Sequence, residues 1–515
     1  MTIEQYLSSV NKRFKLGNAT EHTFRGDLQQ LLESLIPTIR ATNEPKRQSC
    51  GAPDYILTRN GIPVGFVEAK DLGDGDLAGT KKAGNKEQFD RYKAALPNII
   101  FTDYIDFHFY RNGEFTTKVS IGELTGKGVV PLPENFHQFE SLLKDFSFYE
   151  GQAIKSPKTL AMMMADKARL LADIIEKALT SDEENQENSS LQDQMNAFKS
   201  ILIHDITPKG FADVYAQTIA YGMFAASLHD TSLDTFSRQE AATLIPKSNP
   251  FLRKLFQYIA GYDLDERINW IVDSLADMFR SADIATILKN FGKSTKQHDP
   301  IIHFYETFLG EYDPKLRKSR GVWYTPEPVV DFIVRAVDDI LKTEFNLPMG
   351  LADTSKTRVK VRTQTKDKRL SEGYKLEEKE VHKVQVLDPA TGTGTFLAAA
   401  IKQIHKSFEG QGGLWNNYVE EHLIPRLNGF EILMASYSMA HLKLDMLLAE
   451  TGFKPTKAQR FRIFLTNSLE EHHPNTGTLW ANWLSSEANE ANHVKRDTPV
   501  MCIIGNPPYS GESSN

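Results

Sequence analysis

Residues 383–404, KVQVLDPATGTGTFLAAAIKQI, decide the fold of the C-terminal part of the chain. A β-branched run ends at Asp388, a loop with Gly392 and Gly394 follows, and a helical pattern begins directly after the loop. Small residues let the main chain approach a ligand at the carboxyl end of a strand, where open α/β sheets bind cofactors. A dinucleotide fingerprint would need a glycine in place of Leu397, and a P-loop would need Gly-Lys-Ser/Thr. The loop therefore predicts a cofactor other than NAD or a nucleoside triphosphate.

Length and composition set the broad class of the protein. The 515 residues are too many for one hydrophobic core, so two to four domains are expected. A hydrophobic fraction of 40% and a charged fraction of 25% are typical of a soluble protein. No apolar run has the length of a membrane span or the form of a signal peptide, so we expect a cytoplasmic protein without a membrane partner. Only Cys50 and Cys502 are present, which argues against a disulfide framework or a cysteine zinc site.

The hydrophobic pattern divides the chain into three parts. Residues 1–150 mix helical and strand-like runs, residues 151–315 have long helical periodicity, and residues 316–515 alternate helices with strands. Within the third part, the polar stretch 353–382 is interpreted as a surface insertion. The net charge of -7 does not exclude nucleic-acid binding, because binding depends on local patches. One basic segment occurs at Lys81, Lys82, Lys86, Arg91 and Lys93, although such a run is more often a solvated face.

A predicted hairpin brings two carboxylates and a lysine together. In PDYILTRNGIPVGFVEAK, residues 53–70, the Asn60-Gly61 dipeptide between two alternating runs is a strong hairpin signal. Folding about that turn brings Asp54 near Glu68, and the period of two places Lys70 on the same face as Glu68. Asp54 and Glu68 could hold Mg²⁺, a hard ion that prefers oxygen ligands, and Lys70 could stabilise charge during phosphodiester hydrolysis. A bare match of this kind is more often an exposed hairpin with surface charges.

Further residues make this segment resemble the PD-(D/E)xK nuclease superfamily. Pro53-Asp54 and Glu68-Ala69-Lys70 are followed by a predicted helix with Gln88 and Tyr92, which resembles the Q-x-x-x-Y element of some branches. The resemblance implies that Gln88 and Tyr92 lie on one helix face beside the site. It also implies a role for Glu21 as an additional carboxylate, although a glutamate at a helix start usually compensates the helix dipole.

The glycine loop resembles the S-adenosylmethionine loop of amino-methylating DNA methyltransferases. Supporting pieces occur in the expected order: GVWYTP at residues 321–326, NGFE at 428–431 and TNSL at 466–469. The resemblance implies that Glu431 holds the ribose hydroxyls and that position 467 meets the adenine, where Asn467 replaces the usual Asp. The implied cofactor-binding residues are Tyr324, Thr325, Pro326, Asp388, Pro389, Ala390, Gly392, Gly394, Phe396, Glu431 and Asn467.

The tetrapeptide Asn506-Pro507-Pro508-Tyr509 matches the catalytic motif of the same family. In that family the Asn506 side chain and the Pro507 carbonyl would accept hydrogen bonds from an exocyclic amino group. The prolines, including Pro508, fix φ and so hold the carbonyl in place. Tyr509 would stack on a flipped base and favours adenine over cytosine as the target.

Taken together, the chain resembles type IIG and type ISP restriction-modification enzymes, in which a nuclease is fused to a gamma-class N6-adenine DNA methyltransferase. The resemblance implies an α/β multidomain protein: a PD-(D/E)xK nuclease fold at 1–150, an α-helical connector at 151–315 and an incomplete Rossmann-like methyltransferase at 316–515. The implied cofactors are S-adenosylmethionine and Mg²⁺, and the implied partner is double-stranded DNA. We expect the chain to lack C-terminal parts, either as a fragment of a longer protein or as a natural truncation, with target recognition in a separate or missing domain. Two alternatives stay open: a methyltransferase with an inactive nuclease domain, or a non-catalytic DNA-binding remnant.

Overall fold

The computed structural model divides the chain into two compact units. Unit 1 comprises Met1–Glu187, Thr231–Arg238 and Leu264–His298, and unit 2 comprises Asn188–Asp230, Gln239–Asp263 and Asp299–Asn515. The structure describes residues 1–17, 21–43, 52–59, 62–81, 83–148, 154, 156–230, 233–244, 253–254, 256–257, 261, 264–284, 287, 300–313, 325–366, 374–457, 459–470 and 479–507. The mixed α/β class is confirmed, whereas the domain boundaries at 150 and 315 stay predictions.

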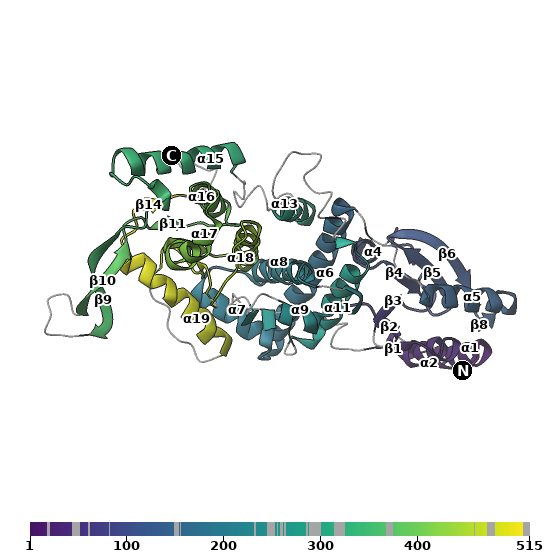
Figure 1. Ribbon diagram of the computed structural model, residues 1–515. Coiled ribbons are helices and arrows are strands. Elements are labelled where there is room, and N and C mark those ends of the chain that lie inside the picture. The colour runs from purple at the N-terminus through teal and green to yellow at the C-terminus, as the bar shows by residue number, and fades with distance from the viewer. Residues whose placement is uncertain are drawn as a thin grey trace, which may run out of the picture. The chain divides into compact units, whose positions relative to one another are not determined.

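Unit 1 contains a six-stranded sheet in the order β1-β2-β3-β4-β5-β6 (Figure 1). The strands β3 and β4 are parallel and the other neighbours are antiparallel. Parallel neighbours need a crossover, and α4 (Ala83–Ala95) supplies it. The strands are β1 (Arg40–Thr42), β2 (Tyr55–Arg59), β3 (Ile62–Ala69), β4 (Asn98–Thr102), β5 (Asp106–Arg111) and β6 (Glu114–Ser120).

The predicted hairpin is confirmed by the pairing of β2 with β3. Tyr55 lies opposite Val67 and Arg59 opposite Ile62, with an irregularity in register between Leu57 and Thr58. The turn residues 60 and 61 lie outside the described residues. The register places position 54, just before β2, next to position 68 near the end of β3, as the sequence predicted.

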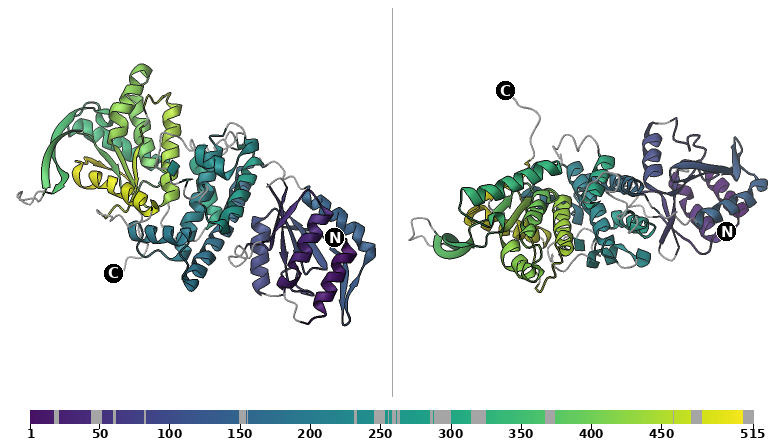
Figure 2. Two further views of the ribbon diagram at one scale, coloured as in Figure 1. Left: turned by 90° about the horizontal axis from the view of Figure 1, so that it is seen from below. Right: turned by 45° about the horizontal axis from the view of Figure 1, so that its top comes forward.

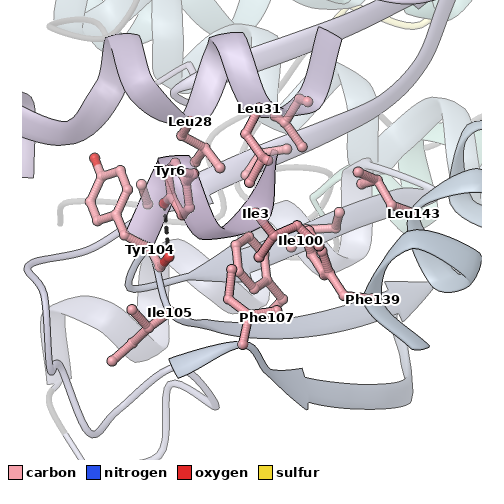
Figure 3. Close-up of a cluster of buried hydrophobic side chains, with 14 of the residues drawn as sticks. Ile3, Tyr6, Leu28, Leu31, Ile100, Tyr104, Ile105, Phe107, Phe139 and Leu143 are labelled. Carbon is pink, nitrogen blue, oxygen red and sulfur yellow. Dashed lines mark hydrogen bonds between the residues drawn. The ribbon is translucent and has the colours of Figure 1, made fainter. Parts of the chain in front are cut away.

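Three helices close one apolar core of unit 1 against the sheet: α1 (Ile3–Phe14), α2 (Arg25–Leu35) and α5 (Phe136–Ser147). The helix α1 starts at a capping box between Thr2 and Gln5, which satisfies main-chain donors at its first turn. Side chains from α1, α2 and the strands interdigitate in this core (Figure 3). Tyr6 is fully buried there, and its hydroxyl donates a hydrogen bond to the Tyr104 carbonyl at 2.8 Å.

A helical layer completes unit 1. The long helix α6 (Pro157–Asn185) begins at the Ser156 cap and packs against α11 (Glu266–Arg280) and α4. The Lys167 amine of α6 is buried and donates to the Ala95 carbonyl at the end of α4, at 3.0 Å. Smaller elements of this unit are η1 (Glu21–Phe24), β7 (Gly122–Thr125), β8 (Gly128–Pro131), η2 (Pro133–Asn135) and η3 (Leu233–Thr235).

Unit 2 begins with helices from the same helical region of the sequence. Serine and threonine caps and a proline in the first turn explain where two of them start, at Ser189 and Thr207. These helices are α7 (Ser190–Ile201), α8 (Pro208–Ser227), α9 (Arg238–Leu244, of which Arg238 belongs to unit 1) and α13 (Pro300–Tyr312). The predicted helical region therefore contributes to both units.

The second sheet is parallel, has the strand order β13-β12-β11-β14, and has helices on both faces (Figures 1 and 2). On one face, Leu387, Phe430 and Phe464 pack against Ala491 and Val494. The strands are β11 (Val386–Asp388), β12 (Leu427–Glu431), β13 (Arg462–Leu465) and β14 (Cys502–Ile503). The helices are α15 (Glu327–Thr343), η4 (Gly350–Ala352), α16 (Thr395–Lys406), α17 (Gly412–Tyr418), η5 (Val419–Leu423), η6 (Ile424–Arg426), α18 (Met434–Glu450), α19 (Leu479–Asn492) and η7 (His493–Asp497).

The predicted surface insertion forms an antiparallel ribbon of β9 (Lys356–Lys366) and β10 (Tyr374–His382) that projects from unit 2 (Figures 1 and 2). Its pairing sets Arg358 opposite Glu380 and Lys360 opposite Glu378. Opposite charges therefore face one another across the two strands. Among the described residues, no helix combines the length and apolar character that a membrane crossing requires.

Candidate active sites

The first candidate site lies at the carboxyl ends of the four parallel strands of unit 2. Because β11 and β14 are paired in parallel, Asp388 and Gly505 lie side by side where the two strands end. A Cβ atom added to Gly505 would lie 2.5 Å from Asp388 Oδ1, so only glycine allows this approach. The structure therefore brings the predicted cofactor loop directly beside the start of the predicted catalytic tetrapeptide.

The glycine loop leads into a helix N-terminus. Gly392 and Gly394 have φ values of +55° and +79°, in the left-handed region that favours glycine. A Cβ atom at Gly394 would approach Ala440 to 3.3 Å, whereas one at Gly392 would meet open space within 4 Å. Gly394 is the N-cap residue of α16, so main-chain N–H groups and the positive end of the helix dipole point toward the loop.

Glu431, at the end of β12, is tied to the loop by main-chain hydrogen bonds. Its Oε2 accepts from the Gly392 amide at 2.7 Å, and its Oε1 accepts from the Ile432 and Leu433 amides at 2.8 Å each. Burial raises the pKa of Glu431 to about 7, although these hydrogen bonds act in the opposite direction. A carboxylate has about four acceptor positions, so at least one more donor can be received.

Asp388 is the second buried acid of this site. It is only 1% exposed, and burial raises its pKa to about 7, with the nearby Glu431 charge contributing in the same direction. Its Oδ1 accepts from the Ala390 amide at 3.2 Å. Its Oδ2 is buried without a hydrogen-bond partner among the described residues. A buried acceptor of this kind indicates a site that a ligand donor completes.

The loop after β13 closes the third side of the site. Ser468 Oγ donates to the Pro389 carbonyl at 2.6 Å and so joins this loop to the glycine loop. The Asn467 amide is engaged within its own loop, since its oxygen accepts from Leu469 N at 3.1 Å and its nitrogen donates to Glu470 Oε1 at 2.9 Å. The position is therefore adjacent to the site, as predicted, but no described contact tests its role toward an adenine.

Lys495, which the sequence did not single out, holds the loop after β13. Its amine donates to Thr466 Oγ1 at 2.8 Å and to the carbonyls of Asn467 and Glu470 at 2.6 Å each. It lies on the π-helix η7, an irregular element that often occurs near functional sites. A lysine 28 positions away from Asn467 gave no signal in the sequence, because only the fold brings the two together.

The remaining residues predicted for this site lie at its edges, in the core beneath it, or outside the described residues. Tyr324, Pro508 and Tyr509 lie outside the described residues. Asn506 and Pro507 are exposed at the end of β14, and Thr325 and Pro326 lead into α15. Phe396 is 4% exposed, so its ring belongs to the core under the loop.

The second candidate site lies in unit 1, around the carboxyl end of β3. Asp54 and Glu68 are 5% and 4% exposed, so both predicted carboxylates are buried rather than on an open hairpin surface. Asp54 Oδ2 accepts from the Ala69 amide at 2.7 Å, which joins the two strands at this point. The structure therefore brings Asp54 and Glu68 to one place, as predicted.

Lys70 and Gln88 complete a small network on Glu68. The Lys70 amine donates to Glu68 Oε1 at 2.8 Å and to Gln88 Oε1 at 2.9 Å. The Gln88 nitrogen donates to the same Glu68 oxygen at 2.8 Å and lies 3.3 Å from the Tyr92 hydroxyl. Burial, followed by the Glu68 charge, raises the pKa of Tyr92 well above its usual range. The predicted helix face with Gln88 and Tyr92 thus lies beside the carboxylates, on α4.

Arg25 is a residue of this site that the sequence did not indicate. Its Nη2 lies 2.5 Å from Asp54 Oδ1, and the side chains are 10% and 6% exposed. The sequence instead suggested Glu21, whose side chain lies outside the described residues. An arginine at the start of a helix is common, and only the packing of α2 against the sheet places this one on Asp54.

The donor set of this site suits a hard cation only in part. Two carboxylates are enough for Mg²⁺, which keeps several water ligands and is often held by one or two carboxylates. Among the described residues, no cluster of three or more His, Cys, Asp or Glu side chains could hold a metal ion. The Arg25 guanidinium, moreover, already pairs with Asp54 Oδ1, so a metal ion at this carboxylate would lie close to a fixed positive charge.

The C-terminal part of the chain is similar to a DNA-methyltransferase domain of known proteins. Residues 363–515 match the family described as "MmeI, DNA-methyltransferase domain". One curated relative, a putative type II restriction enzyme and methyltransferase named RM.MjaORFECS2P from Methanocaldococcus jannaschii, is 21% identical over 224 residues, which cover 40% of this chain and 18% of that protein. The resemblance to restriction-modification enzymes is thereby confirmed.

Solved structures are also similar to this chain. The chain in a DrdV-DNA complex has a TM-score of 0.44 and 21% identity, and the match covers 99% of this chain and 44% of that one. The ATP-dependent Type ISP restriction-modification enzyme LlaBIII, bound to DNA, has a TM-score of 0.47 and 19% identity over 74% of this chain and 22% of that one. The chain thus spans less than half the length of these relatives.

Proposed function

We propose that this chain acts in restriction and modification of DNA, with adenine methylation at the site in unit 2 and Mg²⁺-dependent cleavage at the site in unit 1. One observation carries the proposal: Asp388, Glu431 and the Gly505-Asn506-Pro507 segment converge at the carboxyl ends of adjacent parallel strands. Direct transfer of a group between two ligands requires that the cofactor-binding site and the substrate-binding segment be adjacent.

The residues of unit 2 fit S-adenosylmethionine, which would supply an electrophilic methyl group on its sulfonium. The ribose hydroxyls are donors, and the Glu431 carboxylate, buried and tied to Gly392, is an acceptor at the loop. The buried Asp388 Oδ2 offers a further acceptor for a ligand donor. Gly392 leaves space where a side chain would otherwise stand, so a ligand can lie against the main chain there.

The target amino group would be held by the segment after β14. The side-chain oxygen of Asn506 and the carbonyl of Pro507 would accept its two hydrogens and orient the nitrogen lone pair toward the methyl group. The proline ring limits φ, so the carbonyl needs little reorganisation. Tyr509 would stack on the flipped base, which is a role carried over from the family resemblance.

Methylation is tested by incubating the full chain with S-adenosylmethionine carrying a labelled methyl group and duplex DNA. Digestion of the DNA and mass spectrometry of the nucleosides then report N6-methyladenine or N4-methylcytosine. Asn506→Ala should reduce methyl transfer on the order of a hundredfold while leaving cofactor affinity within about twofold. Label on cytosine would refute the adenine assignment, and equal transfer by both chains would refute the role of Asn506.

In unit 1, Asp54 and Glu68 would hold Mg²⁺, which would activate water and offset charge on the scissile phosphate when bound. Lys70 would stabilise the developing negative charge, because its amine already lies at the Glu68 carboxylate. Gln88 positions both Lys70 and Glu68 through its two amide atoms. The supporting observation is this buried, hydrogen-bonded arrangement of the residue types that metal-assisted hydrolysis needs.

The Arg25–Asp54 ion pair favours a second candidate, in which unit 1 no longer cleaves DNA. Supercoiled plasmid incubated with the chain and Mg²⁺ distinguishes the two. If the nuclease is active, Asp54→Asn and Lys70→Ala should each reduce nicking at least about a hundredfold. Nicking that neither substitution changes would support the methyltransferase with an inactive nuclease domain.

A further inference from the structure

We propose that Arg25 is an internal counterion that keeps the Asp54 carboxylate closed to divalent cations until a cation displaces it. The inference rests on the proposed nuclease function, because it concerns the same two carboxylates. It assigns to the start of α2 a regulatory role in metal loading.

The geometry of Asp54 accounts for both of its oxygens. Oδ1 pairs with Arg25 Nη2 at 2.5 Å, and Oδ2 accepts the Ala69 amide at 2.7 Å. The amide bond belongs to the join between β2 and β3, so it cannot be released without disturbing the sheet. A cation that uses Asp54 must therefore bind directly beside the Arg25 guanidinium or displace it.

Because the site is buried, the Arg25 guanidinium and a divalent cation would compete for the Asp54 carboxylate. Asp54 is 5% exposed and Arg25 8% exposed, so their charges are screened little by water. A buried carboxylate needs a counterion, and Arg25 supplies it in the ligand-free protein. A guanidinium and a divalent ion at the same carboxylate would repel one another strongly at this depth. Binding of the metal ion should therefore require the guanidinium to leave.

The main chain of Arg25 is held separately from its side chain. Its carbonyl accepts a hydrogen bond from the Tyr55 hydroxyl at 2.8 Å, and Arg25 is the first residue of α2. Tyr55 is itself fully buried. Release of Asp54 therefore needs rotation of a long side chain about several bonds, while the helix and the strand stay in place.

Other cationic groups near the acids do not have this relation to Asp54. Lys70 contacts Glu68 and Gln88, and the proposed cleavage reaction needs it in place. Arg13, on α1, pairs with Asp27 at 2.8 Å and is 47% exposed on its side chain. Arg13 therefore provides a matched control: an arginine of the same unit that is ion-paired to a carboxylate elsewhere.

The test is to measure Mn²⁺ binding to the full chain without DNA. Electron paramagnetic resonance reports the concentration of free Mn²⁺, and calorimetry gives an independent measure of the affinity. Arg25→Gln should bind Mn²⁺ on the order of tenfold more tightly than the unmodified chain, because the competing cation is gone. Arg25→Lys, which keeps the charge but lacks the planar fork, should gain a few-fold. Arg13→Gln should leave the affinity unchanged, and Asp54→Asn should abolish the site in every background.

The outcomes separate this inference from the proposed function. An Asp54-dependent Mn²⁺ site whose affinity does not increase in Arg25→Gln would overturn the role of Arg25 and leave the nuclease proposal standing. The absence of an Asp54-dependent site in all variants would overturn the metal-dependent nuclease itself. Circular dichroism checks folding, and if Arg25→Gln is unfolded, the comparison of Arg25→Lys with Arg13→Lys decides the question by the same criterion.

Discussion

Replacement of Glu431 by glutamine tests the proposed cofactor site with the smallest change in shape. The glutamine keeps one oxygen, which can still accept from the Ile432 and Leu433 amides, as Glu431 Oε1 does at 2.8 Å. Its NH₂ group would instead face the Gly392 amide, where Oε2 now accepts at 2.7 Å. The substitution therefore removes the charge and one acceptor at the point where a ribose hydroxyl would bind.

Glu431→Gln should weaken cofactor binding, whereas two opposing effects limit the change in stability. A hydrogen bond to a charged acceptor contributes about 1.5–3 kcal/mol, so S-adenosylmethionine should bind roughly 10- to 150-fold more weakly at pH 8. For folding, two changes oppose each other. Losing the acceptor for Gly392 costs about 1–3 kcal/mol. Removing a buried carboxylate whose pKa is raised from 4.5 to about 7 relieves up to ~3 kcal/mol at pH 8. The free energy of unfolding should thus change by less than ~2 kcal/mol.

Glu431 also predicts how cofactor affinity depends on pH. In the ligand-free protein the raised pKa means that the carboxylate is mostly ionised at pH 8 and mostly protonated at pH 6. Because the hydroxyl donors need the ionised form, affinity should fall as the pH falls from 8 to 6, by about tenfold from this group alone. Glu431→Gln should lack this part of the pH dependence. Any titration of the cofactor itself is common to both chains and cancels in the comparison.

The assay is isothermal titration calorimetry with S-adenosylmethionine at pH 8 and pH 6, with urea unfolding as the stability measurement. Glu487→Gln is the matched control, since Glu487 is a second buried glutamate of unit 2 whose pKa burial raises to about 7. Its partner is Arg460 rather than the loop. The reasoning is wrong if Glu431→Gln binds within twofold of the unmodified chain, or if both chains have the same pH dependence.

Three further outcomes follow from packing and buried charge. Gly222→Ala should destabilise the protein by about 1–3 kcal/mol in urea unfolding, because the added Cβ would overlap the Phe256 ring. Glu487→Gln should leave cofactor affinity unchanged, since it alters a two-point pair with the partly buried Arg460 rather than the contact between Glu431 and Gly392. Burial lowers the pKa of Lys167 to about 8, so the native state loses this proton at lower pH than the unfolded chain does. Stability should therefore rise by about 2 kcal/mol between pH 8 and pH 10, a rise that Lys167→Met should lack.

The sequence predicted both candidate sites where local rules determine geometry. The Asn60-Gly61 turn and the two-residue period of a strand were enough to place Asp54 beside Glu68, and the pairing of β2 with β3 confirms that placement. The glycine loop likewise follows from a strand, small residues and a helix in immediate succession. In both cases these particular residues lie within one hairpin or one strand-loop-helix unit, so the chain itself limits their separation.

Contacts between distant segments could not be predicted in this way. Arg25 reaches Asp54 across 29 positions, and Ser468 reaches Pro389 across 79. Each contact depends on how a helix or loop packs on its sheet, which the period of a single segment does not determine. The β9–β10 ribbon escaped prediction for another reason: with charged side chains along both strands, its pattern resembles that of a polar loop.

The buried carboxylates of the two sites have different partners, and this difference bears on the kind of ligand that each site would bind. Asp388 and Glu431 are held by main-chain donors without a described cation beside them, and burial raises the pKa of both to about 7. Such acids gain most from a ligand that brings neutral or positive donors, as a ribose and a sulfonium nucleoside do. Asp54 instead has an arginine as counterion. An acid that is already neutralised gains little from hydroxyl donors, so under the proposal made above Asp54 would exchange this partner only for a group of higher charge, such as a divalent cation.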